Sequence, residues 1–311
     1  MVMDVRKTVL LAATEATYDV DPVPSATANA IMASGVTVKE MFGALTRDEQ
    51  WKSLDHLPSV LGDVMAEISF ETPALGSGVA GTAPRLGVLH KACAESETIV
   101  SSTSVTYAPT SQNHQSCTIY AYIDGTLHKI TGCMGTKTLA FSATKKLVYK
   151  WTFQGRWIAR TVTALPATVT YETTAKLPPV CKNCTLTYNA FIGLIIANLE
   201  FKDGGKVIKR PSLVDPNGIK GFEITDRTPT FTADPESQFT TSFNFRSDIL
   251  AVTRSVVISA AQAAGNTVTL NIPQANISKI DYGAANNIVL EKLEGECAAN
   301  NGDDSYSIVY T

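Results

Sequence analysis

The chain lacks an excess of basic residues. Its 311 residues include 26 lysines and arginines against 29 aspartates and glutamates, for a formal net charge of -3. A protein that grips nucleic acid needs clustered basic side chains, because binding releases counterions from the phosphates. The composition therefore argues against tight nucleic-acid binding, while it allows a surface that lies near DNA without holding it.

Long apolar runs are also missing. The most apolar stretches, 9–13 and 192–197, are far shorter than the ~20 residues that a membrane helix needs. The first stretch follows Asp4 and does not resemble a secretory signal. The sequence thus predicts a soluble protein that is made in the cytoplasm and has no membrane partner.

Catalytic signatures are absent as well. The sequence has no Walker loop, HExxH, GxSxG or kinase motif. His56 lies near Asp55 and Asp63, but this segment mixes charges without a regular period, which favours a solvated loop over an acid–base site. We therefore predict that the chain is not an enzyme and uses no cofactor.

Two short motifs could suggest other chemistry. Gly76, Gly78 and Gly81 match GxGxxG, the pattern of dinucleotide-binding loops. No regular alternation of strands and helices follows, so a flexible connection is the simpler interpretation.

Cys181 and Cys184 form a CxxC, yet a zinc site needs two further ligands at matched spacing, and the other cysteines and the histidines are scattered. We expect the six cysteines to be free thiols and no metal to bind.

What the chain does have is a core and many short strands. Hydrophobic residues make up 44% and charged residues 18%, which is typical of a folded protein. Alternating runs flank Asp124-Gly125, a strong hairpin signal because both positions tolerate positive φ. Residues 147–153 alternate like a half-buried strand. Similar runs continue to residue 310, which predicts an all-β sandwich or barrel.

The order of elements suggests an internal repeat. Helical spacing is seen at 86–94 and at 243–252, each after a strand-like segment, 67–73 and 228–234. Segments 104–108 and 147–155 then correspond to 255–259 and 288–295. We predict two tandem β modules, each with a flanking short α-helix, at 1–164 and 177–311. The linker, 165–176, lies in a proline-containing stretch.

The N-terminal half resembles phage tail tube proteins, the major tail proteins of long non-contractile tails. No single motif carries the resemblance; the ordered series of segments does. In the first half it runs through 4–24, 28–31, 44–62, 64–70, 76–84, 89–93, 104–109, 118–120 and 124–130, and in the second half through 224–229 and the C-terminal strands. The glycine motif falls on the loop that precedes the helix in this family.

The resemblance implies a structural virion protein of the phage tail. Its modules would join edge to edge into rings of six, and stacked rings would form a hollow tube through which DNA leaves the capsid without specific binding. Two modules per chain would make each ring a trimer, and the alternative is a hexamer of enlarged modules. Expected partners are further copies of the chain, the tape measure protein, the tail terminator and the distal tail proteins.

The resemblance also places a contact between rings in the charged loop 45–63. The candidate residues in this loop are Arg47, Asp48, Glu49, Trp51, Lys52 and Asp55. Another tail or virion β-protein, such as a terminator, baseplate or decoration protein, remains the alternative. A carbohydrate-binding sandwich is less favoured, because Trp51, Trp151 and Trp157 form no cluster in the sequence.

Overall fold

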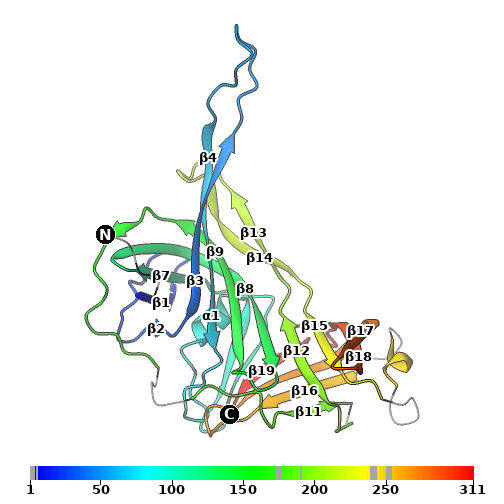
Figure 1. Cartoon of the computed structure of the whole chain (residues 1–311). Helices are drawn as coiled ribbons and strands as arrows, with labels where there is room; N and C mark the ends of the chain where they lie inside the picture. Colours follow the sequence, from blue (N-terminus) through cyan, green and yellow to red (C-terminus); the bar gives the residue numbers. More distant parts are fainter. Residues whose placement is uncertain (1–3, 5, 173–176, 190, 239–243, 250–253) are drawn as a thin grey trace.

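The computed structural model is built almost entirely from β-strands, as the sequence predicts (Figure 1). It describes all residues except 1–3, 5, 173–176, 190, 239–243 and 250–253. The elements of the first half are β1 (Thr8–Thr14), β2 (Ala30–Ile31), β3 (Ser34–Leu45), β4 (Val60–Pro73), α1 (Gly87–Lys91), β5 (Glu95–Val100), β6 (Ser104–Pro109), β7 (Cys117–Ile123), β8 (Thr126–Ser142), β9 (Val148–Trp157) and β10 (Thr161–Val162).

The second half continues with strands of similar length. They are β11 (Thr185–Tyr188), β12 (Ile196–Lys202), β13 (Gly205–Pro211), β14 (Ile219–Arg227), β15 (Thr230–Pro235), the 3-10 turn η1 (Phe245–Asp248), β16 (Arg254–Ala260), β17 (Val268–Ala285), β18 (Ile288–Cys297) and β19 (Ser307–Tyr310). No helix among the described residues is long and apolar enough to span a membrane.

Local sequence explains the individual strands. In β9, Tyr149, Trp151 and Phe153 are buried while Lys150 and Thr152 are exposed, so the alternation read from the sequence is confirmed. The hairpin predicted at Asp124-Gly125 joins β7 to β8, and both turn residues have positive φ, 37° and 90°.

One strand order occurs twice along the chain. In the first half, antiparallel pairs run in the order β3-β4-β9-β8-β7-β1. In the second half they run β12-β15-β18-β17-β16-β11. The matching strands also follow one another in the same sequence order, and α1 and η1 occupy matching places between them.

Two pairings join the halves directly. The end of β8 pairs with β12, with Leu139 opposite Phe201. The C-terminal strand β19 lies between β17 and β6, so the β5–β6 hairpin of the first half extends the sheet of the second. Hence all described strands except β13 and β14, which form a separate hairpin, belong to one hydrogen-bonded sheet.

The sequence matches segment 255–259 with segment 104–108 of the first half, and the structure matches it with a different strand. β16 pairs with β11 and β17, and the strand with equivalent neighbours in the first half is β7. Segment 104–108 lies in β6, which pairs with β5 and β19 instead. Short alternating runs look alike in sequence, and only the pairing distinguishes them.

The two expected helices are shorter than the sequence spacing indicates. Helix α1 covers only Gly87–Lys91, and Ala94, with a φ of 54°, breaks the helical path before β5 begins. The second helix is wrong for the residues that are described: 245–248 form a single 3-10 turn, capped by Asn244 and ended by Ile249 in an extended conformation. Residues 243 and 250–252 of this expected helix lie outside the described residues.

The core extends through both halves. One contiguous cluster of buried side chains includes Trp151 and Phe153 from the first half and Phe201, Leu270 and Ile308 from the second. Truncating a large aromatic side chain in such a core costs about 3–5 kcal/mol. The two-module division at 1–164 and 177–311 remains a prediction beside this shared sheet and core, and 173–176 of its linker lie outside the described residues.

Candidate assembly surfaces

The most prominent surface feature is a projecting arm. The distal part of the β3–β4 hairpin rises from the body and ends in loop 46–59 (Figure 1). The register continues to the end of the hairpin, where Leu45 lies opposite Val60. A two-stranded ribbon with no further strand beside it has little to stabilise it alone, which suits a segment that packs on another molecule.

The structure places all six sequence-predicted contact residues at the tip of this arm. They are Arg47, Asp48, Glu49, Trp51, Lys52 and Asp55. Their described polar contacts stay within the loop: Arg47 Nε lies 3.4 Å from Glu49 Oε1, and Trp51 Nε1 donates to the Asp55 carbonyl at 2.7 Å. The loop therefore holds its own shape while its side chains face outward, and its contact with a second ring remains a prediction.

Apolar residues on the same arm were missed by the sequence reasoning. Leu54 is fully exposed, and Phe42, Leu45, Val60 and Leu61 are each at least half exposed. Exposed apolar side chains gathered on one projection mark a surface for interaction. The available signal was the presence of Leu54 and the Val60-Leu61 pair inside an otherwise charged loop.

The β13–β14 hairpin supports the base of the arm. The Val64 N–H donates to the Asn217 carbonyl at 3.1 Å, and Lys209 forms an ion pair with Asp63. The turn of this hairpin adds two more exposed apolar side chains, Leu213 and Val214. The arm and the turn thus present apolar groups on one side of the molecule.

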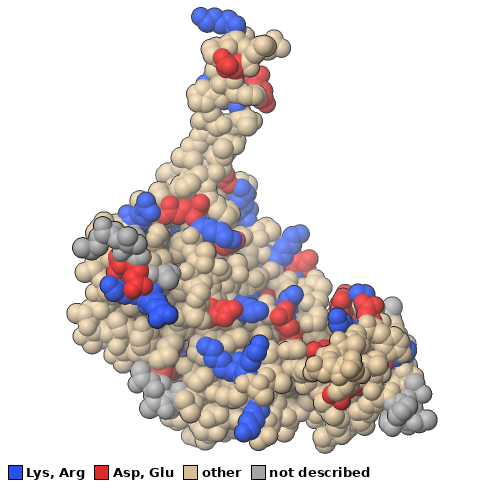
Figure 2. Space-filling view, in the orientation of Figure 1, with Lys and Arg blue, Asp and Glu red and all other residues tan. Residues whose placement is uncertain are grey.

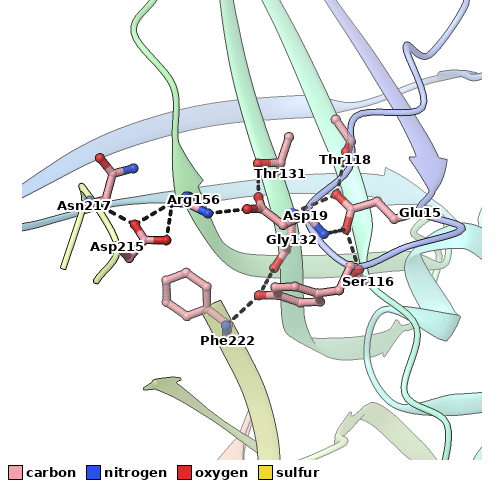
Figure 3. Close-up of polar contacts among 11 residues, drawn as sticks. Glu15, Asp19, Ser116, Thr118, Thr131, Gly132, Arg156, Asp215, Asn217 and Phe222 are labelled. Carbon is pink, nitrogen blue, oxygen red and sulfur yellow. Dashed lines mark hydrogen bonds and ion pairs between the residues drawn. The ribbon is translucent and has the colours of Figure 1, made fainter. Parts of the chain in front are cut away.

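A polar network fastens this hairpin to the body (Figure 3). Arg156 of β9 binds Asp19 on one side and Asp215 on the other, with Nη2 at 2.5 Å from each Asp215 oxygen. The Tyr18 hydroxyl accepts from the Phe222 N–H at 2.6 Å and donates to the Gly132 carbonyl at 3.2 Å. Burial raises the pKa of Tyr18 to about 12, so it stays a donor at neutral pH.

Glu15 organises the loop that carries Tyr18 and Asp19. Its carboxylate accepts from Ser116 Oγ at 2.5 Å, Thr118 Oγ1 at 2.6 Å and the Gly132 N–H at 2.7 Å. It also accepts from the Asp19 N–H at 2.8 Å (Figure 3). A buried carboxylate with several donors is a stable structural element. The network is thereby explained as scaffolding for the arm.

One face of the sheet is polar across both halves. The core face carries the aromatic cluster, and the opposite face carries threonines, lysines and glutamates. Laterally paired residues form a row across seven strands from β4 to β17: Glu71, Lys150, Thr138, Lys202, Thr230, Glu296 and Asn276. This row runs through the β8–β12 junction without interruption, so the two halves share one polar surface.

The lysines of this face lie near carboxylates. Lys39 Nζ is 2.8 Å from Glu67, and Lys202 Nζ is 3.3 Å from Glu200. Lys279 Nζ lies 2.6 Å from Asp281 and 3.3 Å from Glu294. Figure 2 likewise shows interspersed acidic and basic side chains on the face that it displays. At these described positions, each basic side chain that could bind phosphate is accompanied by an acid.

The glycine motif packs against the second half. The Gly76 N–H donates to Asn266 Oδ1 at 2.8 Å, and the Gly78 N–H donates to the Gly265 carbonyl at 2.9 Å. A Cβ atom at Gly76 would lie 2.1 Å from the Gly265 oxygen, so only glycine allows this approach. The motif thus serves backbone packing.

The cysteines are free thiols, as expected, and five of the six are buried. The hydrogen bond from Cys184 lowers the pKa of Cys181 to about 7. Within the described part of the chain, no three His, Cys, Asp or Glu side chains gather as metal ligands would.

A chain of strands with a projecting arm and exposed apolar side chains at its tip has the features of a structural protein. The comparison with known families agrees: a family model described as phage tail tube protein matches residues 6–297. The chain belongs to the phage tail tube protein family, which implies a place in the virion tail. No match is found among curated proteins.

Proposed function

We propose that this chain is the tube subunit that self-assembles into the stacked rings of a phage tail. Three chains form each ring, and each chain supplies two modules, 1–164 and 177–311. The tube conducts DNA during ejection, and the subunit performs no catalysis. It is made in the host cytoplasm and meets the tape measure protein, the tail terminator and the distal tail proteins during assembly.

The observation that carries the proposal is the repeated strand order. β3-β4-β9-β8-β7-β1 and β12-β15-β18-β17-β16-β11 are the same arrangement, and β8 and β12 join them edge to edge. Two units already joined in this way supply one third of a pseudo-sixfold ring. Divergence between the two units is expected, because they occupy non-equivalent positions and carry different inserted hairpins.

The arm connects successive rings in this proposal. Its loop carries Arg47, Asp48, Glu49, Trp51, Lys52 and Asp55 beside exposed apolar side chains, which is the mixture that protein interfaces use. An arm that stands clear of its own body can reach a neighbour without rearranging the core. Burial of Leu54 and Trp51 on the next ring would supply stabilisation that the isolated chain lacks.

The polar sheet face lines the conduit in this proposal. The row from Glu71 to Asn276 crosses both halves, and Lys39, Lys202 and Lys279 are paired with acids. A near-neutral wall neither holds nor strongly repels DNA, so the genome can pass.

Cryo-electron microscopy of the assembled protein tests the proposal. We expect hollow tubes whose cross-section shows three chains and six modules per ring. Six identical chains per ring would overturn the two-module division and leave the tube function standing. A protein that stays monomeric at high concentration, or that is present in only a few copies per virion, would instead favour a terminator, baseplate or decoration protein.

A further inference from the structure

We infer that the ring closes by pairing residues 281–285 of β17 with residues 35–39 of β3 in the next copy of the chain. The inference rests on the proposed tube function and identifies the interface within it. The internal β8–β12 junction serves as its template.

The template is a pair of antiparallel strands that meet beyond the end of β7. β7 covers one edge of β8 as far as Cys133, and β12 then pairs with residues 138–142 of the same edge. Leu139 and Phe201 meet on the core side of this junction, and Thr138 and Lys202 meet on the polar side. The junction thus extends both faces of the sheet.

β17, the counterpart of β8, leaves the equivalent part of its edge unpaired among the described strands. β16 covers β17 as far as Ala275, and among the described strands none pairs with 276–285 on the side away from β18. Tyr282 in this segment is 69% exposed. An open stretch of backbone donors and acceptors at a sheet edge is a ready site for another strand.

β3, the counterpart of β12, also has one edge that no described strand occupies. β3 pairs with β4, and no other described strand pairs with it. β3 leads from the body of the chain into the arm, so its first residues lie at the base of the arm (Figure 1). One chain therefore presents the two halves of a β8–β12-type junction at different places, as a head-to-tail contact requires.

The template also sets the register. We align the two halves by placing the last residue of β8, Ser142, on the last residue of β17, Ala285. Leu139 is then equivalent to Tyr282. Following the paired residues across β9 and β4 in the first half, and across β18 and β15 in the second, makes Val38 equivalent to Phe201. Tyr282 would then lie opposite Val38 of the partner subunit.

The charges on the polar side agree with this register. Asp281 would lie opposite Lys39 of the partner subunit, at the place where Thr138 meets Lys202 in the template. Their side chains are 53% and 60% exposed in the single chain. Within the single chain, Asp281 is paired with Lys279 at 2.6 Å and Lys39 is paired with Glu67 at 2.8 Å. Opposite charges in a cross-strand pair stabilise it, so the register joins these two pairs into one cluster of alternating charge across the interface.

The turn after β17 determines which pairs suit a disulfide. Asn286 and Asn287 have φ values of 50° and 64° and join Ala285 to Ile288, as in a two-residue hairpin. The two residues that flank such a turn, Ala285 and Ile288, form a hydrogen-bonded pair, and hydrogen-bonded pairs recur at every second residue of the strand. Asp281 therefore directs its backbone N–H and C=O toward β18. Its pair with Lys39 of the partner subunit would be non-hydrogen-bonded, with Cα atoms about 4.5 Å apart, a distance that a disulfide can bridge.

Cysteine cross-linking tests the pairing. The double variant Asp281→Cys with Lys39→Cys should, after assembly and mild oxidation, run as a covalent trimer on a non-reducing gel. The matched control is Asp281→Cys with Glu67→Cys, because Glu67 lies opposite Lys39 on β4, on the same face but one strand further away, at about 9–10 Å. The parent protein controls for its own cysteines. Tubes without the trimer in the first variant would overturn the pairing and leave the tube function standing, whereas a parent protein that never assembles would overturn both.

A charge exchange gives an independent readout. Asp281→Lys alone and Lys39→Asp alone should each raise the critical concentration for assembly by about fivefold, because an attractive pair becomes a repulsive one. The double exchange should bring the critical concentration back toward the parent value but not fully to it, because the exchanged charges would then repel Glu67 and Lys279 within the chain. Equal critical concentrations in all four proteins, measured by sedimentation and electron microscopy, would contradict the register.

Discussion

Lys137→Met is the substitution whose effect the structure defines most sharply. Lys137 lies on β8, its side chain is fully buried, and it forms an ion pair with the equally buried Glu95. The other Glu95 oxygen lies 2.7 Å from Nδ1 of His90, whose own pKa is lowered by burial. The buried Asp203 interacts electrostatically with both Lys137 and Glu95. Methionine has about the same length but no charge, so the variant leaves a buried carboxylate without its cation.

The magnitude follows from the pKa of Glu95. Burial would raise this pKa, but Lys137 and His90 lower it from 4.5 to about 2. A lowering of that size corresponds to about 3 kcal/mol of preferential stabilisation of the charged form. Removing one partner of a buried ion pair commonly costs about 3–5 kcal/mol. We expect Lys137→Met to lower the free energy of unfolding by that amount at pH 7.5.

The pH dependence distinguishes this cause from a simple packing defect. In the parent protein, the stabilisation by Glu95 is present above pH 4.5 and is lost as the pH falls toward 2. In the variant only His90 still opposes the effect of burial, so the pKa of Glu95 rises above its value in the parent. The deficit should therefore be smaller at pH 4.5 than at pH 7.5. Urea unfolding at pH 7.5 and 4.5 measures both values.

The control is Lys137→Met with Glu95→Gln, which removes both charges. Replacing a buried ion pair with neutral groups is often close to neutral, so the part of the deficit that comes from Glu95 should return. The remaining part is that of the buried Asp203, which still lacks Lys137. The reasoning would be refuted by a single variant as stable as the parent, or by a deficit of equal size at both pH values.

Three further predictions concern the assembly surfaces. Replacing loop 46–59 with an Asn-Gly turn should leave rings that no longer stack into tubes, and normal tubes in electron micrographs would contradict the role of the arm. Arg156→Met should cost about 1–2 kcal/mol and make turn 212–218 more sensitive to limited proteolysis, because two carboxylates lose their donor; an unchanged digestion pattern would count against it. Glu200→Lys with Glu296→Lys should produce salt-sensitive DNA binding in a mobility-shift assay, whereas Glu200→Gln with Glu296→Gln should not; equal binding by both would argue against a conduit-lining face.

Much of the local structure could be predicted from the sequence because it depends on neighbouring residues. Alternation in 147–153 indicated a strand that buries every second side chain, and the turn chemistry of Asp124-Gly125 indicated a hairpin. The resemblance to phage tail tube proteins arose in the same way, from an ordered series of local segments, and the family match over 6–297 confirms it.

The assembly surfaces were predicted only in part. The charged residues of loop 46–59 could be identified, because a long polar loop between two strands is visible in any sequence. That this loop ends an arm, and that Phe42 is exposed on it, could not be foreseen. An apolar residue in a strand is expected to be buried, and only the path of the hairpin away from the body leaves it in solvent.

By itself, the sequence determined an all-β chain with a tail tube pattern and predicted a repeat of its elements. Only the tertiary structure decided that β7 is the counterpart of β16, that β19 pairs with β6, and that Lys137 lies buried against Glu95. The physical reason is that strand pairing joins residues far apart in the chain. Any alternating run can pair with many others, and the choice depends on which arrangement buries the whole core and satisfies its polar groups at once.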